Sequence, residues 1–458
     1  MIDKRTISLA SLGLMGSPIY ALNFRLQDIL LKRGLIGSGT DLFSFFLYQY
    51  VLLGILYLTG VGIVFRRGRH KAMAPHILSI ILFFGVMYRL LLVPSQPMLS
   101  WDMYRYIWDG RVQAHGINPY RYPPNNEALE KLQDSAIYPY IGRKGSLTIY
   151  PAGAQVLFYL LNRLGATSVV AFKGVILLFD MGSIFLLVML LANLGLNREK
   201  VLVYAWNPLI IYELANNGHL DGFVIFFVLL TLWFLIKERP HASVSSLALA
   251  TSLKLYPFII LPAILREKKF RGLLLFSAIF LVFYLPYLSV GKEVLGYLPE
   301  YFTNPYEIFN LGLKAYLLKL FPSMNHWVAT KTLGVALIVA AGVVWIKRKK
   351  DSADTIMLAY LLAGLLVVLT SASLHPWYIL WIIPFLSLFP SPAWLYFSLV
   401  IPFSYLKYES PTGTFPEWVR HIEYIPFFIL LSMEYVFFQR SSRRLFPWRL
   451  PEENSNKN

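Results

Sequence analysis

Apolar runs alternate with short polar segments along most of the chain. Many runs reach the roughly 17 to 25 residues that a helix needs to cross the hydrocarbon core of a bilayer. The pattern therefore predicts an all-α fold, a polytopic bundle of about twelve transmembrane helices. The candidate spans are 6–23, 42–65, 76–93, 167–193, 201–215, 220–236, 272–290, 327–346, 355–373, 377–389, 391–407 and 421–438.

Short basic runs between the apolar segments give the predicted orientation. Arginines and lysines collect at 66–71, 347–350 and 440–449. Cytoplasmic loops carry an excess of Lys and Arg, and the three runs share one side if both termini are cytoplasmic. The segments predicted to face outside are then 94–166, 216–219, about 291–326, His375–Pro376 and 408–420.

Segment 244–265 has two interpretations. As a single span it would put the basic residues at 266–271 outside, although Lys237 and Arg239 just before it are inside. A re-entrant hairpin, broken near Lys254–Pro257, returns the chain to the cytoplasm. Broken backbone at membrane depth is tolerated where it lines protein or a water-filled cavity. We favour the hairpin, which makes 94–166 a long extracytoplasmic first loop.

Composition supports a membrane protein and excludes several other classes. The chain is 57% hydrophobic and only 15% charged, against about 25% charged residues in soluble domains. Its net charge of +17 fits the cytoplasmic basic runs, so no nucleic-acid partner is expected. There is no cysteine and no nucleotide-binding glycine motif. We expect one transmembrane domain over 1–450 and a disordered cytoplasmic tail over 451–458.

The first predicted loop opens with SWDMYRYIWDGRVQAHGINPYRYPP, residues 100–124. Asp102, Arg105 and Asp109 are spaced i, i+3, i+7, so on a helix they share one face. Trp101, Tyr104, Trp108 and Arg111 make an adjoining stripe. A carboxylate at the mouth of a membrane cavity can act as a general base, and arginines can hold a phosphate. The alternative is an interfacial helix with belt aromatics and solvated charges.

Three later segments carry polar groups between or inside apolar runs. Asn217, His219 and Asp221 follow one span; they suit hydrogen bonds to a sugar or phosphate, or form an ordinary tight turn. Lys254 and Tyr256 lie in TSLKLYP, where the lysine needs an anionic partner or reaches an interface. His375 and Trp377 lie between two spans; the histidine could serve a phosphate or an acceptor hydroxyl, or the segment is an aromatic belt. No zinc-binding HExxH occurs.

Together these segments resemble a known family. WDMYRYIWDGRVQAHGINPYRYPP, NGHLDG, LKLYPFIILPAIL and HPWYILWIIPF, in this order, are similar to the GT-C integral membrane glycosyltransferases, above all to polyprenyl-phosphate-mannose-dependent mannosyltransferases. The resemblance covers about 76–390. It implies a GT-C helix bundle whose extracytoplasmic site transfers a hexose, mannose in the closest branch, from a polyprenyl-phosphate donor to a lipid or glycan acceptor.

The resemblance also implies roles for residues. A first-loop aspartate is the catalytic base in that family, and here it is Asp102, with Asp109 as the second candidate and His375 assisting. Unlike members with adjacent acidic pairs, Asp102 is followed by Met103, so no cofactor is certain and a divalent metal stays open. The donor phosphate is expected on Arg105, Arg111 and Lys254. The expected substrate-binding residues are Trp108, Tyr120, Asn217, His219, Asp221, Tyr256 and Trp377.

Two other readings compete with this one. A secondary transporter or lipid flippase without catalysis also uses broken helices and intramembrane charge, but such proteins commonly show two similar halves, and none is found here. A GT-C relative that moves an oligosaccharide or aminosugar is the other. Glucose, galactose and arabinose stay open beside mannose, and so does the acceptor. We expect a multi-pass protein of the cell membrane, with membrane lipids as its surroundings.

Overall fold

The computed structural model describes residues 3–32, 40–66, 75–265, 269–303, 309–347, 351–369, 373–410 and 413–440. Helices make up 77% of the chain, and the described residues contain no strand, so the all-α prediction is confirmed. The basic runs at 67–71, 348–350 and 441–449 and the tail 451–458 lie outside the described residues.

The α-helices in chain order are α1 (Lys4–Lys32), α2 (Thr40–Phe65), α3 (Pro75–Leu92), α4 (Asp102–Ala114), α5 (Ala152–Arg163), α6 (Val169–Asn193), α7 (Leu202–Ala205), α8 (Pro208–Ile211), α9 (Asp221–Ile236), α10 (Pro240–Leu253), α11 (Leu261–Ile264), α12 (Lys269–Val282), α13 (Leu298–Thr303), α14 (Leu313–Leu320), α15 (His326–Lys347), α16 (Ser352–Val368), α17 (Ile383–Leu386), α18 (Pro392–Val400) and α19 (Glu417–Arg440). Short 3-10 turns are η1 (Glu127–Leu132), η2 (Tyr138–Tyr140), η3 (Arg198–Val201), η5 (Tyr256–Ile260), η6 (Leu285–Leu295), η7 (Pro376–Trp381) and η8 (Ile401–Glu409). The turn η4 (Tyr212–Asn216) is a π-helix.

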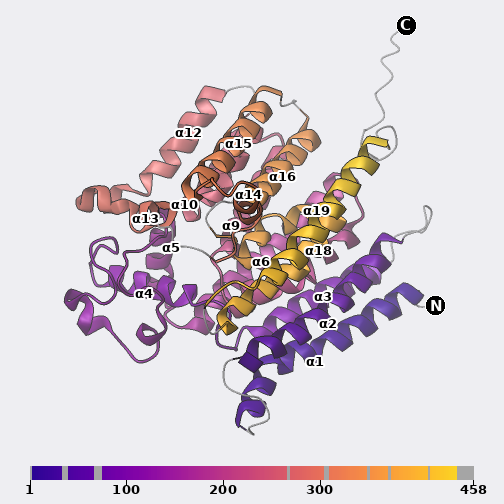
Figure 1. Ribbon diagram of the computed structural model, residues 1–458, viewed down its shortest axis with the longest axis horizontal. Helices are drawn as coiled ribbons and strands as arrows, with labels where there is room; N and C mark the ends of the chain where they lie inside the picture. The colour runs from indigo at the N-terminus through magenta and orange to yellow at the C-terminus, as the bar shows by residue number, and fades with distance from the viewer. Residues whose placement is uncertain are drawn as a thin grey trace.

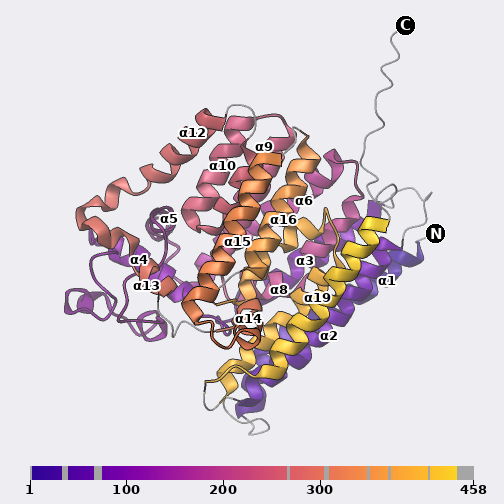
Figure 2. The same cartoon turned by 45° about the horizontal axis from the view of Figure 1, so that its top comes forward.

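The helices form two groups around a shared core. On one side α1 packs on α2 and α3, and α18 packs on α19. In the centre α9 packs between α6 and α10, while α15 and α16 run beside them (Figure 2). The helix α4 and its neighbour α5 lie at the far end from α1–α3 (Figure 1). The short helices α7 and α8 and the π-turn are almost completely buried in the middle of the protein.

Three described helices are long and apolar enough to cross a membrane: Phe43–Phe65, Val169–Asn193 and His326–Ile346. A fourth span arises if the pair Phe270–Val282 and Leu285–Tyr301, bent by 88°, counts as one. The prediction of about twelve spans stays a prediction. Several expected spans are broken: 201–215 consists of α7, α8 and η4. Such breaks suit a membrane protein only when they lie inside protein, and these are buried.

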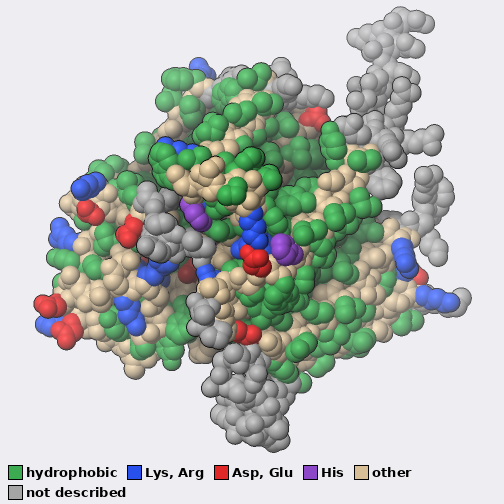
Figure 3. All heavy atoms as spheres, in the orientation of Figure 1, with side chains coloured by type: hydrophobic (Ala, Val, Ile, Leu, Met, Phe, Trp, Pro, Cys, Tyr) green, Lys and Arg blue, Asp and Glu red, His purple; other side chains and the backbone are tan. Residues whose placement is uncertain are grey.

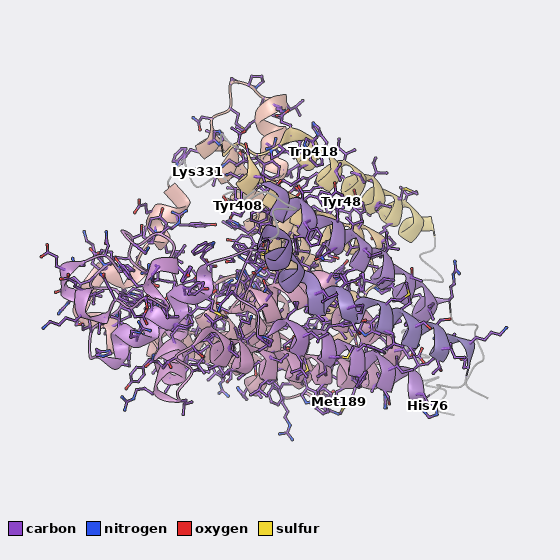
Figure 4. All side chains as sticks on the ribbon, turned by 90° about the horizontal axis from the view of Figure 1, so that it is seen from below. Tyr48, His76, Met189, Lys331, Tyr408 and Trp418 are labelled. Carbon is purple, nitrogen blue, oxygen red and sulfur yellow. The ribbon has the colours of Figure 1, made fainter. Side chains whose placement is uncertain are left out.

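The surface agrees with a membrane environment. Apolar side chains cover much of the face over α2, α15 and α19, as Figure 3 shows, and include exposed Ile55, Ile338 and Ile429. Charged side chains gather around α4 at the opposite end. Figure 4 places Lys331, Tyr408 and Trp418 toward one side of the molecule, and His76 and Met189 toward the other. These two groups belong to ends that the sequence predicts on opposite sides of the membrane.

The chain turns back near Lys254, where the sequence predicts a break. The helix α10 ends at Leu253, and Lys254 is extended, with φ −145° and ψ 143°. The turn η5 and the short helix α11 follow. A Cβ atom built on Gly272 would lie 2.7 Å from Leu265 and 3.8 Å from Val244, near the beginning of α10. The chain has therefore returned to the end where α10 began, which is the geometry of a hairpin.

A buried ion pair joins three helices of the core. Arg89 on α3 pairs with Asp180 on α6, and neither side chain is exposed. Arg89 also donates to the carbonyl oxygen of Ala205 (2.6 Å), and Tyr204 donates to Asp180 (2.7 Å). Removing one partner of such a pair costs about 3–5 kcal/mol, because the other charge is left buried and unpaired. This pair therefore fixes how α3, α6 and α7 pack.

Candidate functional site

Asp102 begins α4 and is the exposed end of a polar line. Its side chain is 38% exposed, and its carboxylate Oδ2 lies 3.8 Å from Nδ1 of His219, which is fully buried. Its place in the first turn suits a negative charge, because the N-terminal end of a helix carries partial positive charge. The structure therefore brings together the first-loop aspartate and the NGHLDG segment, which are more than a hundred residues apart.

Glu213 completes this line from the buried side. Its Oε2 lies 3.2 Å from Nε2 of His219, although neither ring nitrogen makes a hydrogen bond among the described residues. Asn217 donates to the same oxygen (2.7 Å), and Tyr405 donates to the other oxygen (2.7 Å). Glu213 is fully buried in the π-turn η4, and π-turns are frequent at functional sites. The line Asp102–His219–Glu213 is the first half of the site.

Stacked rings extend from His219 to the HPWY segment. Trp377 lies on His219 with ring centroids 4.4 Å apart, and His375 lies on Trp377 at 4.3 Å and 10°. Phe309 closes the column on the far side of His375 at 4.5 Å. The Nδ1 atom of His375 is buried and makes no hydrogen bond among the described residues. A buried polar atom without a partner costs about 1–3 kcal/mol, so this edge of the column is suited to a ligand.

Lys254 and Asp221 form the second half of the site. Lys254 Nζ lies 2.6 Å from Oδ2 of Asp221, and the indole nitrogen of Trp381 donates to Oδ1 (3.0 Å). Tyr256 stacks on Trp381 with centroids 3.9 Å apart, and its buried hydroxyl makes no hydrogen bond among the described residues. The partner that the sequence required for Lys254 is therefore Asp221, at the start of α9.

The two halves meet at Tyr106. Burial raises the pKa of the Tyr106 hydroxyl well above its usual value, and the charges of Asp102 and Asp221 raise it further. Burial also raises the pKa of the Tyr150 hydroxyl. The charge of Asp102 raises this pKa further, and the charge of Arg105 lowers it. The charges of Asp102 and Asp221 therefore act on one shared hydroxyl group, that of Tyr106.

Positive charge lies near the ring column, where Lys407 Nζ is 5.6 Å from the centre of the Phe309 ring. Burial lowers the pKa of His375 to about 3, and the nearby charges of His219, Lys407, Lys254 and Arg143 lower it further. Arg143 has a φ of +51°, in the left-handed region that non-glycine residues seldom adopt, and it donates to the hydroxyl of Tyr297 (2.9 Å). Non-glycine residues held in this region tend to occur at functional sites. The environment of His375 is suited to an anion.

Asp109 lies on the same helix as Asp102 but has its own partners. Arg105 donates to one of its oxygens (2.8 Å), which is the i, i+4 pair that the sequence allowed, and Gln155 donates to the other (2.9 Å). Arg105 also donates to the carbonyl oxygen of Ser146 (3.1 Å). Asp109 is buried, so its described contacts hold α4 against α5 and against the segment before it.

The aromatic stripe of α4 faces the segment 127–141 and not the ring column. Trp108 packs on Tyr138 with centroids 5.5 Å apart and is 1% exposed. Arg111 pairs with Asp134 (2.7 Å) and donates to the carbonyl oxygen of Leu132. The structure therefore does not bring Trp108 or Arg111 into contact with the Asp102 line; both dock this segment on α4.

Tyr120 and Asn217 also have structural partners. Tyr120 donates to the carbonyl oxygen of Tyr150 (2.8 Å) and packs edge-on against Tyr287, in a small separate core. Asn217 accepts from the backbone nitrogens of Met98 and Leu99 while it donates to Glu213. Asn217 therefore positions the buried glutamate and ties the segment before α4 to η4, whereas Tyr120 has no described contact with the site.

Sequence analysis missed Glu213, Arg143 and Trp381. Glu213 gave a usable signal, because a glutamate inside an apolar run is by default a candidate for function. Arg143 and Trp381 gave none, since a loop arginine and a membrane-boundary tryptophan are common. Among the described residues, no group of three His, Asp or Glu side chains is arranged to hold a metal ion.

Comparison with known proteins gives the family. The model of the alpha-(1->6)-mannopyranosyltransferase N-terminal domain matches residues 38–266, half of the chain. The chain belongs to this mannosyltransferase family. The GT-C-type resemblance seen in the sequence points the same way, and a glycosyltransferase is supported over a transporter. No curated protein matches the chain. The matched range contains Asp102, Glu213, His219, Asp221 and Lys254, so most of the site lies within the family domain.

Proposed function

We propose that this mannosyltransferase transfers a mannose from a polyprenyl-phosphate donor to a hydroxyl of a lipid or glycan acceptor, on the extracytoplasmic side of the membrane. The observation that carries the proposal is the half-exposed Asp102 backed by buried His219 and Glu213, beside a group of cations. The acceptor hydroxyl needs a base to take its proton, and the leaving phosphate needs positive charge to stabilise it.

Asp102 is the general base of this proposal. In the transfer, a bond forms between the acceptor oxygen and the anomeric carbon while the bond from that carbon to the phosphate oxygen breaks. The acceptor proton passes to the Asp102 carboxylate, and polyprenyl phosphate leaves. Because a sugar hydroxyl has a pKa far above 7, a positioned base is worth about 10²–10⁴-fold in rate. His219 lies 3.8 Å from this carboxylate, and Glu213 lies 3.2 Å behind His219.

The leaving phosphate is held by cations in this proposal. Lys254 is already in the site through Asp221, and Lys407 and Arg143 lie near the same ring column. Fixed positive groups stabilise the negative charge that develops on the leaving oxygen, and they are worth more in a water-poor site than in water. The polyprenyl chain is expected along the apolar surface beside Tyr256, Pro257 and Phe385. The cavity of about 20 Å³ among these residues has room only for about one water molecule.

The residues of the first loop divide into two roles in this proposal. Asp109 and Arg105 position α4, because each is already bound by buried partners. We no longer assign the phosphate to Arg111, whose guanidinium is engaged by Asp134. The orientation with both termini in the cytoplasm places Asp102, His375 and Lys407 on the same outer side as the lipid-linked donor.

The test is transfer by purified protein in nanodiscs, with a synthetic polyprenyl-phosphate mannose and mass spectrometry of the products. Asp102→Asn keeps the size of the side chain and removes its basicity. We expect turnover to fall at least about 100-fold, the low end for loss of a general base. The control is Asp351→Asn, at the exposed start of α16, because Asn caps a helix about as well as Asp. Normal turnover of Asp102→Asn would remove Asp102 from the reaction. No mannosyl product from the unaltered protein with any polyprenyl-phosphate donor would refute the donor class.

A further inference from the structure

A second cavity opens beside Trp101, the residue before Asp102. It has a volume of about 370 Å³ and is lined mainly by Trp101, Tyr104 and Tyr140, with Gln96 and Ser135. Pockets for small molecules have volumes of about 300–1,000 Å³. We call it the Trp101 cavity. The site described above does not use it, and none of its lining residues is charged.

The aromatic rings of the Trp101 cavity are open to solvent. Tyr140 stacks on Tyr104 with centroids 5.0 Å apart, and its ring is tilted by 36° against Trp101 at 5.6 Å. Trp101 is nevertheless 53% exposed and Tyr140 42% exposed, whereas Trp108 of the same helix is 1% exposed. The segment 127–141 covers Trp108 where it packs on α4, but the rings of Trp101 and of its own Tyr140 stay exposed. Amphipathic aromatic rings at a wet surface are typical of contact sites.

Neutral polar groups complete the wall. The Tyr104 hydroxyl donates to Oε1 of Gln96 (3.2 Å), which leaves the two amide protons of Gln96 without an acceptor among the described residues. The Ser135 side chain is exposed at the rim. A hexopyranose has an apolar face of C–H groups that packs on an aromatic ring, and hydroxyls that need donors and acceptors at its edge. A phosphate would need positive charge, which this wall lacks.

We propose that the Trp101 cavity binds a mannose unit of a glycan acceptor and directs a hydroxyl of the neighbouring unit toward Asp102. The inference rests on the proposed function for the direction of transfer. Asp102 directly follows Trp101, and both side chains reach solvent, 38% and 53% exposed. Because successive side chains on a helix point in different directions, a glycan held on the indole ring presents the hydroxyl of a neighbouring unit, and not of the bound unit, to the carboxylate. Donor phosphate and acceptor sugar then meet at the first turn of α4.

The first experiment measures binding without transfer. Purified protein in nanodiscs is titrated with soluble α-(1→6)-linked mannotriose by calorimetry, in the absence of donor. We expect binding by the unaltered protein and by Asp102→Asn, and a Kd about tenfold higher for Trp101→Ala and for Gln96→Ala. Trp418→Ala is the matched control, because Trp418 is 51% exposed but lies on α19 (Figure 4); its Kd should not change.

The second experiment measures transfer to the same mannotriose. Trp101→Ala should raise the acceptor KM about tenfold and leave the donor KM within about twofold. Unchanged mannotriose affinity in both Trp101→Ala and Gln96→Ala would overturn the proposal, and so would no binding by the unaltered protein or a rise in the donor KM alone. The two proposals fail separately: mannotriose binding without any transfer contradicts the proposed function, whereas transfer with an unchanged acceptor KM contradicts only the Trp101 cavity.

Discussion

Glu213 offers a sharp test of how the site works, because its two oxygens have different donors. Asn217 donates to Oε2 and Tyr405 donates to Oε1, both at 2.7 Å. Glu213→Gln keeps the shape of the side chain but turns one acceptor oxygen into a donor. A glutamine has one acceptor oxygen for these two donors, so at least one hydrogen bond is lost. The negative charge 3.2 Å from His219 is lost as well.

The size of the effect follows from these contacts. A hydrogen bond to a charged group contributes about 1.5–3 kcal/mol. If the Glu213 charge stabilises His219 while Asp102 takes up the acceptor proton, most of this free energy is lost from the transition state. Since about 1.4 kcal/mol corresponds to tenfold in rate, kcat should fall about 10- to 150-fold. The KM for the donor should change little, because Glu213 is fully buried and cannot touch the substrate.

The assay is mannose transfer in nanodiscs, with kcat and both KM values measured beside the Tm. The matched control is Glu199→Gln. Glu199 is also buried and accepts from Arg5 (2.8 Å) and Asn197 (3.1 Å), but it lies on η3 and makes no described contact with Asp102, His219 or Lys254. That variant should lower the Tm and leave kcat unchanged. If Glu213→Gln behaves in the same way, with kcat within twofold of the unaltered enzyme, Glu213 supports only the fold and the reasoning is wrong.

Three further predictions concern the donor, pH and topology. Lys254→Ala should weaken binding of polyprenyl phosphate, the leaving product, about tenfold or more, measured in nanodiscs; unchanged affinity would withdraw the lysine from the phosphate. Burial lowers the pKa of His375 to about 3. Between about pH 3 and 6.5 the unfolded chain therefore binds more protons at this residue than the folded protein does. This contribution to folding stability is present above pH 6.5 and is lost as the pH falls through that window. His375→Phe should therefore flatten the acidic limb of Tm against pH, and an unchanged limb would contradict the assignment. Cysteines at His241 and Arg271, both exposed, should label only from the cytoplasm, with Glu130→Cys as the outer control; outside labelling of position 271 would exclude the hairpin.

The sequence predicted local features of the fold well. The helix over 102–114 follows from the i, i+3, i+7 pattern, and its end agrees with Gly116, which has a φ of +76°. The break at Lys254 was predicted from the positive-inside bias, because a single span over 244–265 would put the basic residues at 266–271 outside. The shared face of Arg105 and Asp109 also follows from this pattern, and the two side chains pair because residues four apart meet on a helix.

Partners that lie far apart in the chain could not be predicted. Lys254 needed an anion, and its pattern gave no reason to choose Asp221 over a lipid headgroup. The α4 stripe contained both Trp101 and Trp108, but periodicity cannot tell which side of a helix receives a covering segment and which stays open. The count of about twelve spans relied on hydropathy alone, which does not show that runs such as 201–215 are broken into short buried helices.

Charges inside the apolar bundle fall into two kinds, and their hydrogen bonds distinguish them. Arg89 and Asp180 are buried and bound by each other, by backbone carbonyls and by a tyrosine, so the pair contributes to packing. Among the described residues, only Nη2 of Arg89 lacks a hydrogen-bond partner in this pair. His219 is just as buried, yet neither ring nitrogen makes a hydrogen bond among the described residues, and a buried polar group without a partner is costly. A fold retains such a group when a function, such as binding a substrate, offsets this cost in free energy. The unpaired imidazole lies between the exposed Asp102 and the buried Glu213, where a shift of a proton or a bound substrate could complete its bonds. His219 lacks described hydrogen bonds at both ring nitrogens, whereas Arg89 lacks one at a single nitrogen. That difference, and not charge burial itself, marks the line Asp102–His219–Glu213 as the candidate catalytic one.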